Sequence, residues 1–170
     1  MQMFFRIKTE GFAPGVPKRL INQVIKSVLH RLGVMWHEKF RGKHFTVAGA
    51  REYGYTPRKG EGQTGKSFWR SYTGRKKKET GHQRPLVFSG ESQMLTRIRD
   101  VRATSKRVRV VMRAKKFNYR NEHSDIRMHD EMTRVSDSEH ATMVRAADEM
   151  MAAELRSLQH HSVSLIASAA

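Results

Sequence analysis

The chain has 170 residues, with 33 Lys and Arg against 16 Asp and Glu, a net charge of +17, and no cysteine. A chain of this length can bury about two thirds of the surface that its unfolded form exposes, so it can form a core without disulfides or metals. The lack of cysteine excludes a disulfide scaffold, a thiol nucleophile and a Cys-ligated zinc site. No apolar run reaches the length of about 18 residues that a membrane span needs, and residues 1–8 lack the apolar segment of a signal peptide. We expect a single domain, 1–170, outside the membrane.

Charge is divided unevenly along the sequence. Residues 1–121 contain 29 Lys and Arg and 7 Asp and Glu, a net charge of +22, whereas residues 122–170 contain 4 and 9, a net charge of −5. Such an excess of positive charge repels itself unless a polyanion or an acidic neighbouring surface compensates it. The same asymmetry suits copies of one protein stacked head to tail. Charge alone does not choose between these partners.

The first forty residues predict a strand followed by a helix. Residues 3–8 are aromatic and β-branched enough for a strand, and Pro17 suits the first position of a helix. Apolar side chains then recur at spacings of three and four residues, at Leu20, Ile21, Val24, Ile25, Val28, Leu29 and Leu32. This pattern predicts an amphipathic core helix that continues toward Trp36 and Phe40.

Residues 42–84 show no regular apolar spacing. Glycines and basic residues alternate there with aromatic residues, and four basic residues stand together at 75–78. We expect this segment to be an extended basic loop that leaves the compact fold. Its basic side chains suit a phosphate backbone and its aromatic rings suit unpaired bases. The alternative is a solvated loop that pairs with acidic groups of another subunit.

The next part of the chain predicts a short helix and a hairpin. Residues 91–95 suit one helical turn, and the alternating runs 98–103 and 107–113 predict two antiparallel strands. Because side chains alternate across a strand, Val108, Val110 and Met112 share one face. The arginines Arg107, Arg109 and Arg113 point to the opposite face, where they form an outer row.

The last part predicts a strand and a helix. Residues 130–135 suit a strand, and Ser136 to Glu139 match the Ser-x-x-Glu capping box that begins a helix. We expect this helix to reach about residue 158 and to bury Val144, Ala147, Met151, Leu155 and Leu158. The elements together predict an α+β fold, in which a small antiparallel sheet is packed by a long N-terminal helix and a C-terminal helix.

Three patterns suggest enzymes or metal sites, and each fails. Residues 60–67 match the nucleotide-binding pattern G-x-x-x-x-G-K-S, but no apolar strand precedes them, and Gly74 limits any helix after them. His37 and Glu38 begin a zinc-protease pattern in which Arg41 occupies the second ligand position. The histidines and carboxylates between 123 and 131 have unspecific spacing, which favours a solvated loop. We predict no enzyme activity and no catalytic, cofactor or metal site.

Three stretches in order carry a resemblance: REYGYTPR at 51–58, three lysines at 76–78 that lead into GHQRPLVFSGE at 81–91, and EMTRVSDSE at 131–139. With the hairpin and the capped helix, this order resembles the small neck and tail-completion (head–tail connector) proteins of tailed bacteriophages and prophages. It covers residues 51 to about 158. The resemblance implies a structural virion protein that is assembled in the host cytoplasm. Its α+β subunits form a ring at the head–tail junction, around the path of double-stranded DNA.

The resemblance and the basic segment together suggest two groups of contact residues. Subunit or neighbour contacts are expected from Tyr53, Tyr55, Arg58, Phe68, Trp69, Tyr72, His82, Arg84, Pro85, Leu86 and Phe88. The DNA-facing group is Arg75, Lys76, Lys77, Lys78, Arg107 and Arg109, and the two groups could exchange roles. The expected partners are other copies of the chain, other phage neck proteins, tail tube or tail terminator proteins, and double-stranded DNA. No contact with a membrane is expected. The alternative function is a non-virion basic protein that binds RNA or DNA directly.

Overall fold

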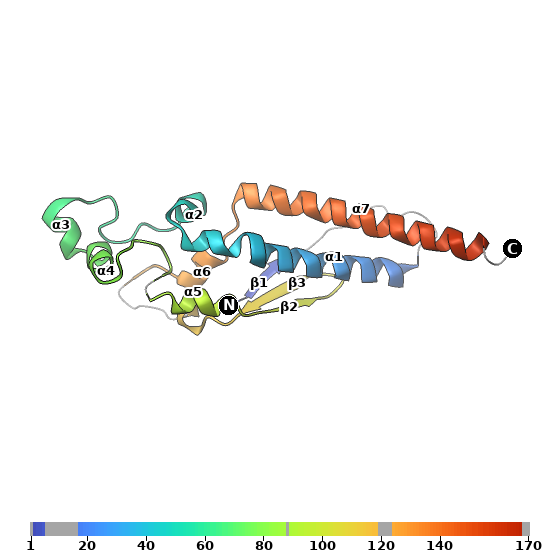
Figure 1. The fold of residues 1–170 in the computed structure, drawn as a ribbon, viewed down its shortest axis with the longest axis horizontal. Helices are drawn as coiled ribbons and strands as arrows, with labels where there is room; N and C mark the ends of the chain where they lie inside the picture. Colours follow the sequence, from blue (N-terminus) through green and yellow to red (C-terminus); the bar gives the residue numbers. More distant parts are fainter. Residues whose placement is uncertain (1, 6–16, 88, 119–123, 168–170) are drawn as a thin grey trace. The chain divides into compact units, whose positions relative to one another are not determined.

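A computed structural model describes residues 2–5, 17–87, 89–118 and 124–167. The elements in chain order are β1 (Gln2–Phe5), α1 (Lys18–Lys39), the 3-10 helix η1 (Arg41–Phe45), α2 (Val47–Glu52), α3 (Gly65–Arg70), α4 (Tyr72–Thr80), α5 (Glu91–Leu95), β2 (Arg99–Ala103), β3 (Val108–Met112), the 3-10 helix η2 (Lys115–Asn118), α6 (Met128–Met132) and α7 (Asp137–Ala167) (Figure 1). The strands lie in the order β1-β3-β2, and β2 and β3 form the predicted antiparallel hairpin. The predicted α+β fold with long N-terminal and C-terminal helices is confirmed.

The chain divides into two compact units, and each combines segments that are distant in the sequence. Unit 1 contains His37–Arg99 and Val111–Ser136, and unit 2 contains Gln2–Trp36, Asp100–Val110 and Asp137–Ala170. The expectation of a single domain, 1–170, stays a prediction. The predicted strand at 3–8 is present as β1, and its residues after Phe5 lie outside the described ones.

An aliphatic core holds unit 2 together. Ile25 and Leu29 of α1 pack with Val108 of β3, as the apolar spacing of α1 predicts. Burying one such side chain stabilises a fold by about 1.5–3 kcal/mol. The helix lies very close to the hairpin at Gly33, where an added Cβ atom would be 2.9 Å from side-chain carbons of Val101 and Val108. Glycine is therefore the residue that lets α1 approach the sheet.

Helix α7 runs alongside α1 in unit 2 (Figure 1). The indole nitrogen of the fully buried Trp36 donates a hydrogen bond to the Glu139 carboxylate, and Arg31 pairs with Glu154 at 3.2 Å. The helix begins directly after Ser136, as predicted, and continues beyond the predicted end at residue 158. The predicted buried face is wrong at Val144, which is 46% exposed.

The first buried positions of α7 differ from the prediction, since Glu139 is 0% exposed and faces Trp36. Met143, one helical turn after Glu139, is 6% exposed and takes the place predicted for Val144. The other predicted positions, Ala147, Met151, Leu155 and Leu158, are half-buried. A polar residue thus sets the orientation of this helix.

The expectation of an extended basic loop over residues 42–84 is wrong, because η1 and helices α2, α3 and α4 occupy much of this segment. Side-chain caps begin two of these helices. The hydroxyl of Thr46 accepts a hydrogen bond from the Gly49 amide at 2.9 Å, and that of Ser71 accepts one from the Gly74 amide at 3.2 Å. Such caps satisfy amides that have no partner within the helix. At Gly74 an added Cβ atom would lie 2.1 Å from the Phe68 carbonyl oxygen, so this glycine permits close packing.

The expected strand at 130–135 is also wrong, because Met128–Met132 form helix α6. Glu131 and Met132 are neighbours in the sequence, and both are almost fully buried, at 2% and 0% exposure. A strand with one solvated face would bury only one of two successive side chains. The helical backbone lets Met132 enter the core while Glu131 meets a basic partner.

Candidate partner and nucleic-acid interface

Arg58 lies in the segment that follows α2, and within unit 1 it attaches this segment to helix α6. Its guanidinium contacts both carboxylate oxygens of Glu131, at 2.6 and 2.5 Å, and the Thr56 amide donates to the same carboxylate at 3.2 Å. Burial lowers the pKa of Arg58, but the hydrogen bond and the charge of Glu131 outweigh it, so the pKa is raised. Arg58, an expected neighbour contact, therefore has an internal partner.

A histidine that the sequence analysis did not single out organises the tyrosines of unit 1. The ring of His44 stacks on Tyr53 with centroids 3.9 Å apart, and its Nδ1 lies 2.6 Å from the Tyr55 hydroxyl. Burial lowers the pKa of His44 to about 4, so the ring is neutral at pH 7. Tyr53 and Tyr55 are 5% and 8% exposed, which places these expected neighbour contacts in the interior.

Helices α3 and α4 of unit 1 carry exposed aromatic and basic side chains. Trp69 is 52% exposed and Tyr72 is 43% exposed, and the side chains of Arg75, Lys77 and Lys78 are exposed beside them on α4. We call these five residues the basic–aromatic surface. The Lys77 ammonium lies 5.9 Å from the ring centroid of Trp69, and also 5.9 Å from that of the buried Phe68. This distance is within the range of a cation–π contact.

Lys76 does not belong to that surface. Its side chain is 6% exposed, and its ammonium donates a hydrogen bond of 2.5 Å to the Arg84 carbonyl oxygen. Burial lowers the pKa of Lys76 to about 8, and repulsion from Arg58 and Arg84 acts in the same direction. The expectation that Lys76 faces DNA is therefore corrected, because the ammonium points into unit 1.

The expected contacts between 82 and 88 differ in exposure. Arg84 is exposed and His82 is half-exposed, whereas Pro85 and Leu86 are buried. Leu86 has a φ of 54°, a left-handed conformation that is uncommon for residues other than glycine. Phe88 lies outside the described residues.

The arginine row of the hairpin follows the predicted alternation. Val108, Val110 and Met112 are 0%, 0% and 2% exposed, while Arg107 and Arg113 are exposed and Arg109 is half-buried. The inward and outward faces of β3 are thus confirmed. Of the two expected DNA-facing residues on this strand and its turn, Arg107 is the more exposed.

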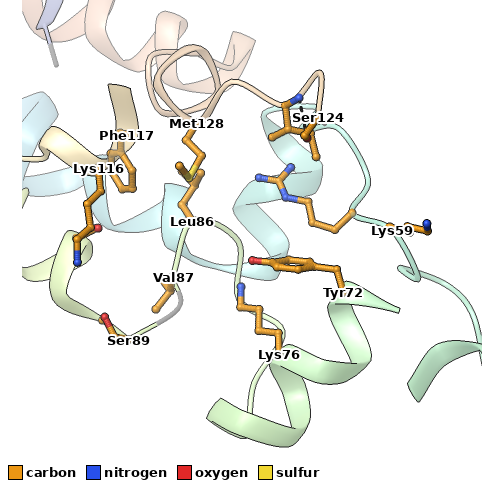
Figure 2. Close-up of a pocket in the computed structure, with 14 residues that line it drawn as sticks. Lys59, Tyr72, Lys76, Leu86, Val87, Ser89, Lys116, Phe117, Ser124 and Met128 are labelled. Carbon is orange, nitrogen blue, oxygen red and sulfur yellow. Dashed lines mark hydrogen bonds between the residues drawn. The ribbon is translucent and has the colours of Figure 1, made fainter. Parts of the chain in front are cut away.

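A pocket of about 580 Å³ lies within unit 1. Figure 2 shows apolar side chains, Leu86, Val87 and Met128 among them, beside basic ones. The basic lining residues are Arg58, Lys59, Lys76 and Lys116. Sequence analysis did not predict this pocket, because its lining comes from parts of the chain that are far apart in the sequence.

The G-x-x-x-x-G-K-S pattern of residues 60–67 lies on a turn and a short helix. Helix α3, which begins at Gly65 of the G-x-x-x-x-G-K-S pattern, has six residues, and residues 59–62 before it form a turn. No group of three His, Asp or Glu side chains among the described residues could hold a metal ion. Within the same residues, no helix is long and apolar enough to span a membrane.

Comparison with known proteins adds no relative. No family model matches the chain, and neither a curated protein nor a solved structure is similar to it.

Proposed function

We propose that this chain is a structural component of a phage particle, which forms a homo-oligomeric ring in the neck at the head–tail junction. Double-stranded DNA would pass through this ring. The observation that carries the proposal is the basic–aromatic surface, Trp69, Tyr72, Arg75, Lys77 and Lys78, together with the order of motifs that resembles the connector family. Tryptophan, tyrosine and arginine are enriched where proteins meet partners. The surface therefore supports an assembly role.

The charge distribution supports contacts between copies. Residues 1–121 have a net charge of +22 and residues 122–170 have −5. Opposite charges on different parts of one chain favour a head-to-tail contact, which closes into a ring when the rotation between copies permits it. The remaining positive charge suits a channel that surrounds DNA, because a cationic lining neutralises phosphates without reading bases. Other neck proteins and tail tube or tail terminator proteins would bind to the faces of such a ring.

A second function is favoured by the exposed aromatic rings. Trp69 and Tyr72 beside Arg75, Lys77 and Lys78 also suit direct binding of single-stranded nucleic acid, in which bases stack on aromatic side chains. In this alternative the protein acts outside the virion. Base stacking requires unpaired bases, whereas a channel lining requires duplex DNA only.

The mass of the purified protein over a concentration series tests the proposal. The mass is measured at two salt concentrations. We expect closed oligomers that form without DNA, either from the protein alone or after it is mixed with neck and tail proteins. A persistent monomer that binds RNA or DNA tightly, and loses it steeply with added salt, would instead establish the alternative function.

Two matched triple variants sharpen this test. Changing Arg75, Lys77 and Lys78 to Gln removes three charges from the basic–aromatic surface. Changing Lys18, Arg19 and Lys26 to Gln removes three charges from the exposed side of α1 in unit 2. If the basic–aromatic surface contacts DNA or a neighbour, the first variant weakens that contact and the second does so less. Equal effects would mean that net charge alone matters.

A further inference from the structure

The pocket of unit 1 contains a buried positive charge that no carboxylate of the described residues neutralises. Lys76 is 6% exposed, and the acceptor for its ammonium is the Arg84 carbonyl oxygen. Within the described residues no carboxylate is paired with Lys76. Buried cations are ordinarily paired, because desolvation of an unpaired charge is costly. The pocket therefore lacks one negative charge.

Each of the other basic lining residues is either paired with a carboxylate or exposed to solvent. Arg58 is paired with Glu131 at 2.5 Å, and Lys116 is paired with Glu91. Lys59 is exposed, and its side chain points away from the other labelled side chains in Figure 2. Among the buried lining residues that the structure describes, Lys76 is thus the one cation without a carboxylate partner. A single negative charge would balance it.

The rest of the lining combines apolar side chains with the hydroxyl groups of Tyr72, Ser89, Ser92 and Ser124. Leu86, Val87, Phe117, Ile126 and Met128 line the pocket, and Leu86 holds its position with a φ of 54°. A left-handed conformation is strained at a leucine, and residues in such conformations cluster at ligand sites. A phosphate would bring two negative charges to the one buried ammonium. A carboxylate on an apolar body matches both the one charge and the apolar wall.

We infer that this pocket is a docking site for a peptide segment of a partner protein, in which an acidic side chain flanked by apolar side chains places its carboxylate on Lys76. The role of the partner as a component of the same assembly rests on the proposed function. The carboxylate would accept a hydrogen bond from the Lys76 ammonium, and the flanking side chains would contact Leu86 and Met128. Charge complementarity and the apolar wall together define the chemistry of the segment.

A titration with two probe peptides tests this inference on the full chain. The probes are acetylated and amidated Leu-Glu-Leu and Leu-Gln-Leu, which differ in charge and hardly in shape. The binding is followed by amide chemical shifts in nuclear magnetic resonance spectra. We expect the acidic peptide to bind about tenfold to a hundredfold more tightly, because a hydrogen bond between charged groups is worth that factor. The shifts should centre on residues 86–87 and 116–117.

Two variants separate the pocket from the general charge of the protein. In Lys76→Met the two peptides should bind with equal, weak affinity, because the apolar wall remains and the cation is gone. In Lys66→Met, which removes an exposed lysine from α3 of the same unit, the preference for the acidic peptide should be unchanged. Equal binding of both peptides to the unmodified protein would overturn the inference, and so would loss of the preference in Lys66→Met.

A third probe distinguishes the source of the carboxylate. Octanoate carries the same charge on a flexible acyl chain, and tighter binding of octanoate than of the acidic peptide would overturn a peptide partner in favour of an acyl ligand. These titrations are independent of ring formation. A monomeric protein that prefers the acidic peptide would contradict the ring and keep the docking site, whereas rings without that preference would do the reverse.

Discussion

Unit 2 is centred on aliphatic side chains, whereas unit 1 is centred on aromatic and ionic ones. In unit 2, Ile25 and Leu29 pack on Val108. In unit 1, His44 stacks on Tyr53 and Glu131 holds Arg58 at 2.5 Å. The free energy of the aliphatic contacts scales with the apolar surface they bury and does not require a particular orientation. The ionic contacts differ, because removing one partner leaves the other as an uncompensated buried charge. The two units should therefore respond differently to substitution.

The largest effect is expected from Glu131→Ala. Glu131 is 2% exposed and contacts the guanidinium of Arg58 and the amide of Thr56. Its removal leaves Arg58 half-buried without a carboxylate, which we expect to cost about 3–5 kcal/mol of unfolding free energy. Urea denaturation measures the loss, and hydrogen exchange should locate it in unit 1.

A matched control for Glu131→Ala is Asp130→Ala, the neighbouring carboxylate on α6, which is exposed. We expect this control to change stability by less than about 0.5 kcal/mol. An equally large loss in Asp130→Ala would mean that the net charge of α6, and not the buried pair, stabilises unit 1.

Lys76→Met is expected to stabilise unit 1. In the folded protein, burial lowers the pKa of Lys76 to about 8, whereas the ordinary pKa of a lysine is 10.5. Between these values the unfolded chain binds more protons, so stability rises as the pH is raised through this window. Below pH 8 the folded state bears the whole penalty, which corresponds to roughly 3 kcal/mol.

The pH dependence distinguishes this effect from ordinary repacking. Between pH 8 and 10.5 the stability advantage of Lys76→Met over the unmodified protein should decline and then vanish, as measured by urea midpoints across that range. The exposed neighbour Lys78 provides the control, since Lys78→Met should show no such decline. A gain for Lys76→Met that is constant with pH would contradict the buried charge.

Gly33→Ala tests the close approach of α1 to the hairpin in unit 2. The added methyl group would lie 2.9 Å from side-chain carbons of both Val101 and Val108, and β-branched side chains have little freedom to move. We expect a loss of about 1–3 kcal/mol in thermal or urea unfolding. Gly42→Ala is the matched control, because nothing lies within 4 Å of its added carbon.

The contrast between the units also explains which parts of the fold could be predicted from sequence. Helix α1 and strand β3 bury regularly spaced apolar residues such as Leu29 and Val110, and spacing is visible in a sequence. The short helices of residues 42–84 begin at caps such as Thr46, and their glycines resemble those of a loop. Caps and close contacts depend on partners that a local pattern does not contain.

The candidate site could be predicted from the sequence less completely than the fold. Trp69, Tyr72, Arg75, Lys77 and Lys78 were among the residues chosen for their type, and their exposure leaves them available for contacts. Tyr53, Tyr55, Arg58 and Lys76 were chosen in the same way, but they have internal partners. The choice between surface and interior depends on partners that residue type does not reveal. Arg58 pairs with Glu131, which is distant in the chain, and Lys76 pairs with the carbonyl group of Arg84. The pocket, which joins residues 58 to 128, had no local signal at all.

The smallest effect is expected from the cap of α2, and it tests whether local signals stabilise unit 1. Thr46→Ala removes the hydroxyl that accepts from the Gly49 amide at 2.9 Å and donates to the Lys43 carbonyl at 2.8 Å. A lost cap costs about 1 kcal/mol, measured as a fall in the urea midpoint. Thr46→Ser keeps the hydroxyl and should retain most of the stability. If the serine variant lost as much as the alanine variant, the methyl group of Thr46 and not its hydrogen bonds would stabilise this turn. Because Thr46 is exposed, its methyl group buries little surface. We therefore expect the cap hydrogen bonds to contribute more to stability than the methyl group does.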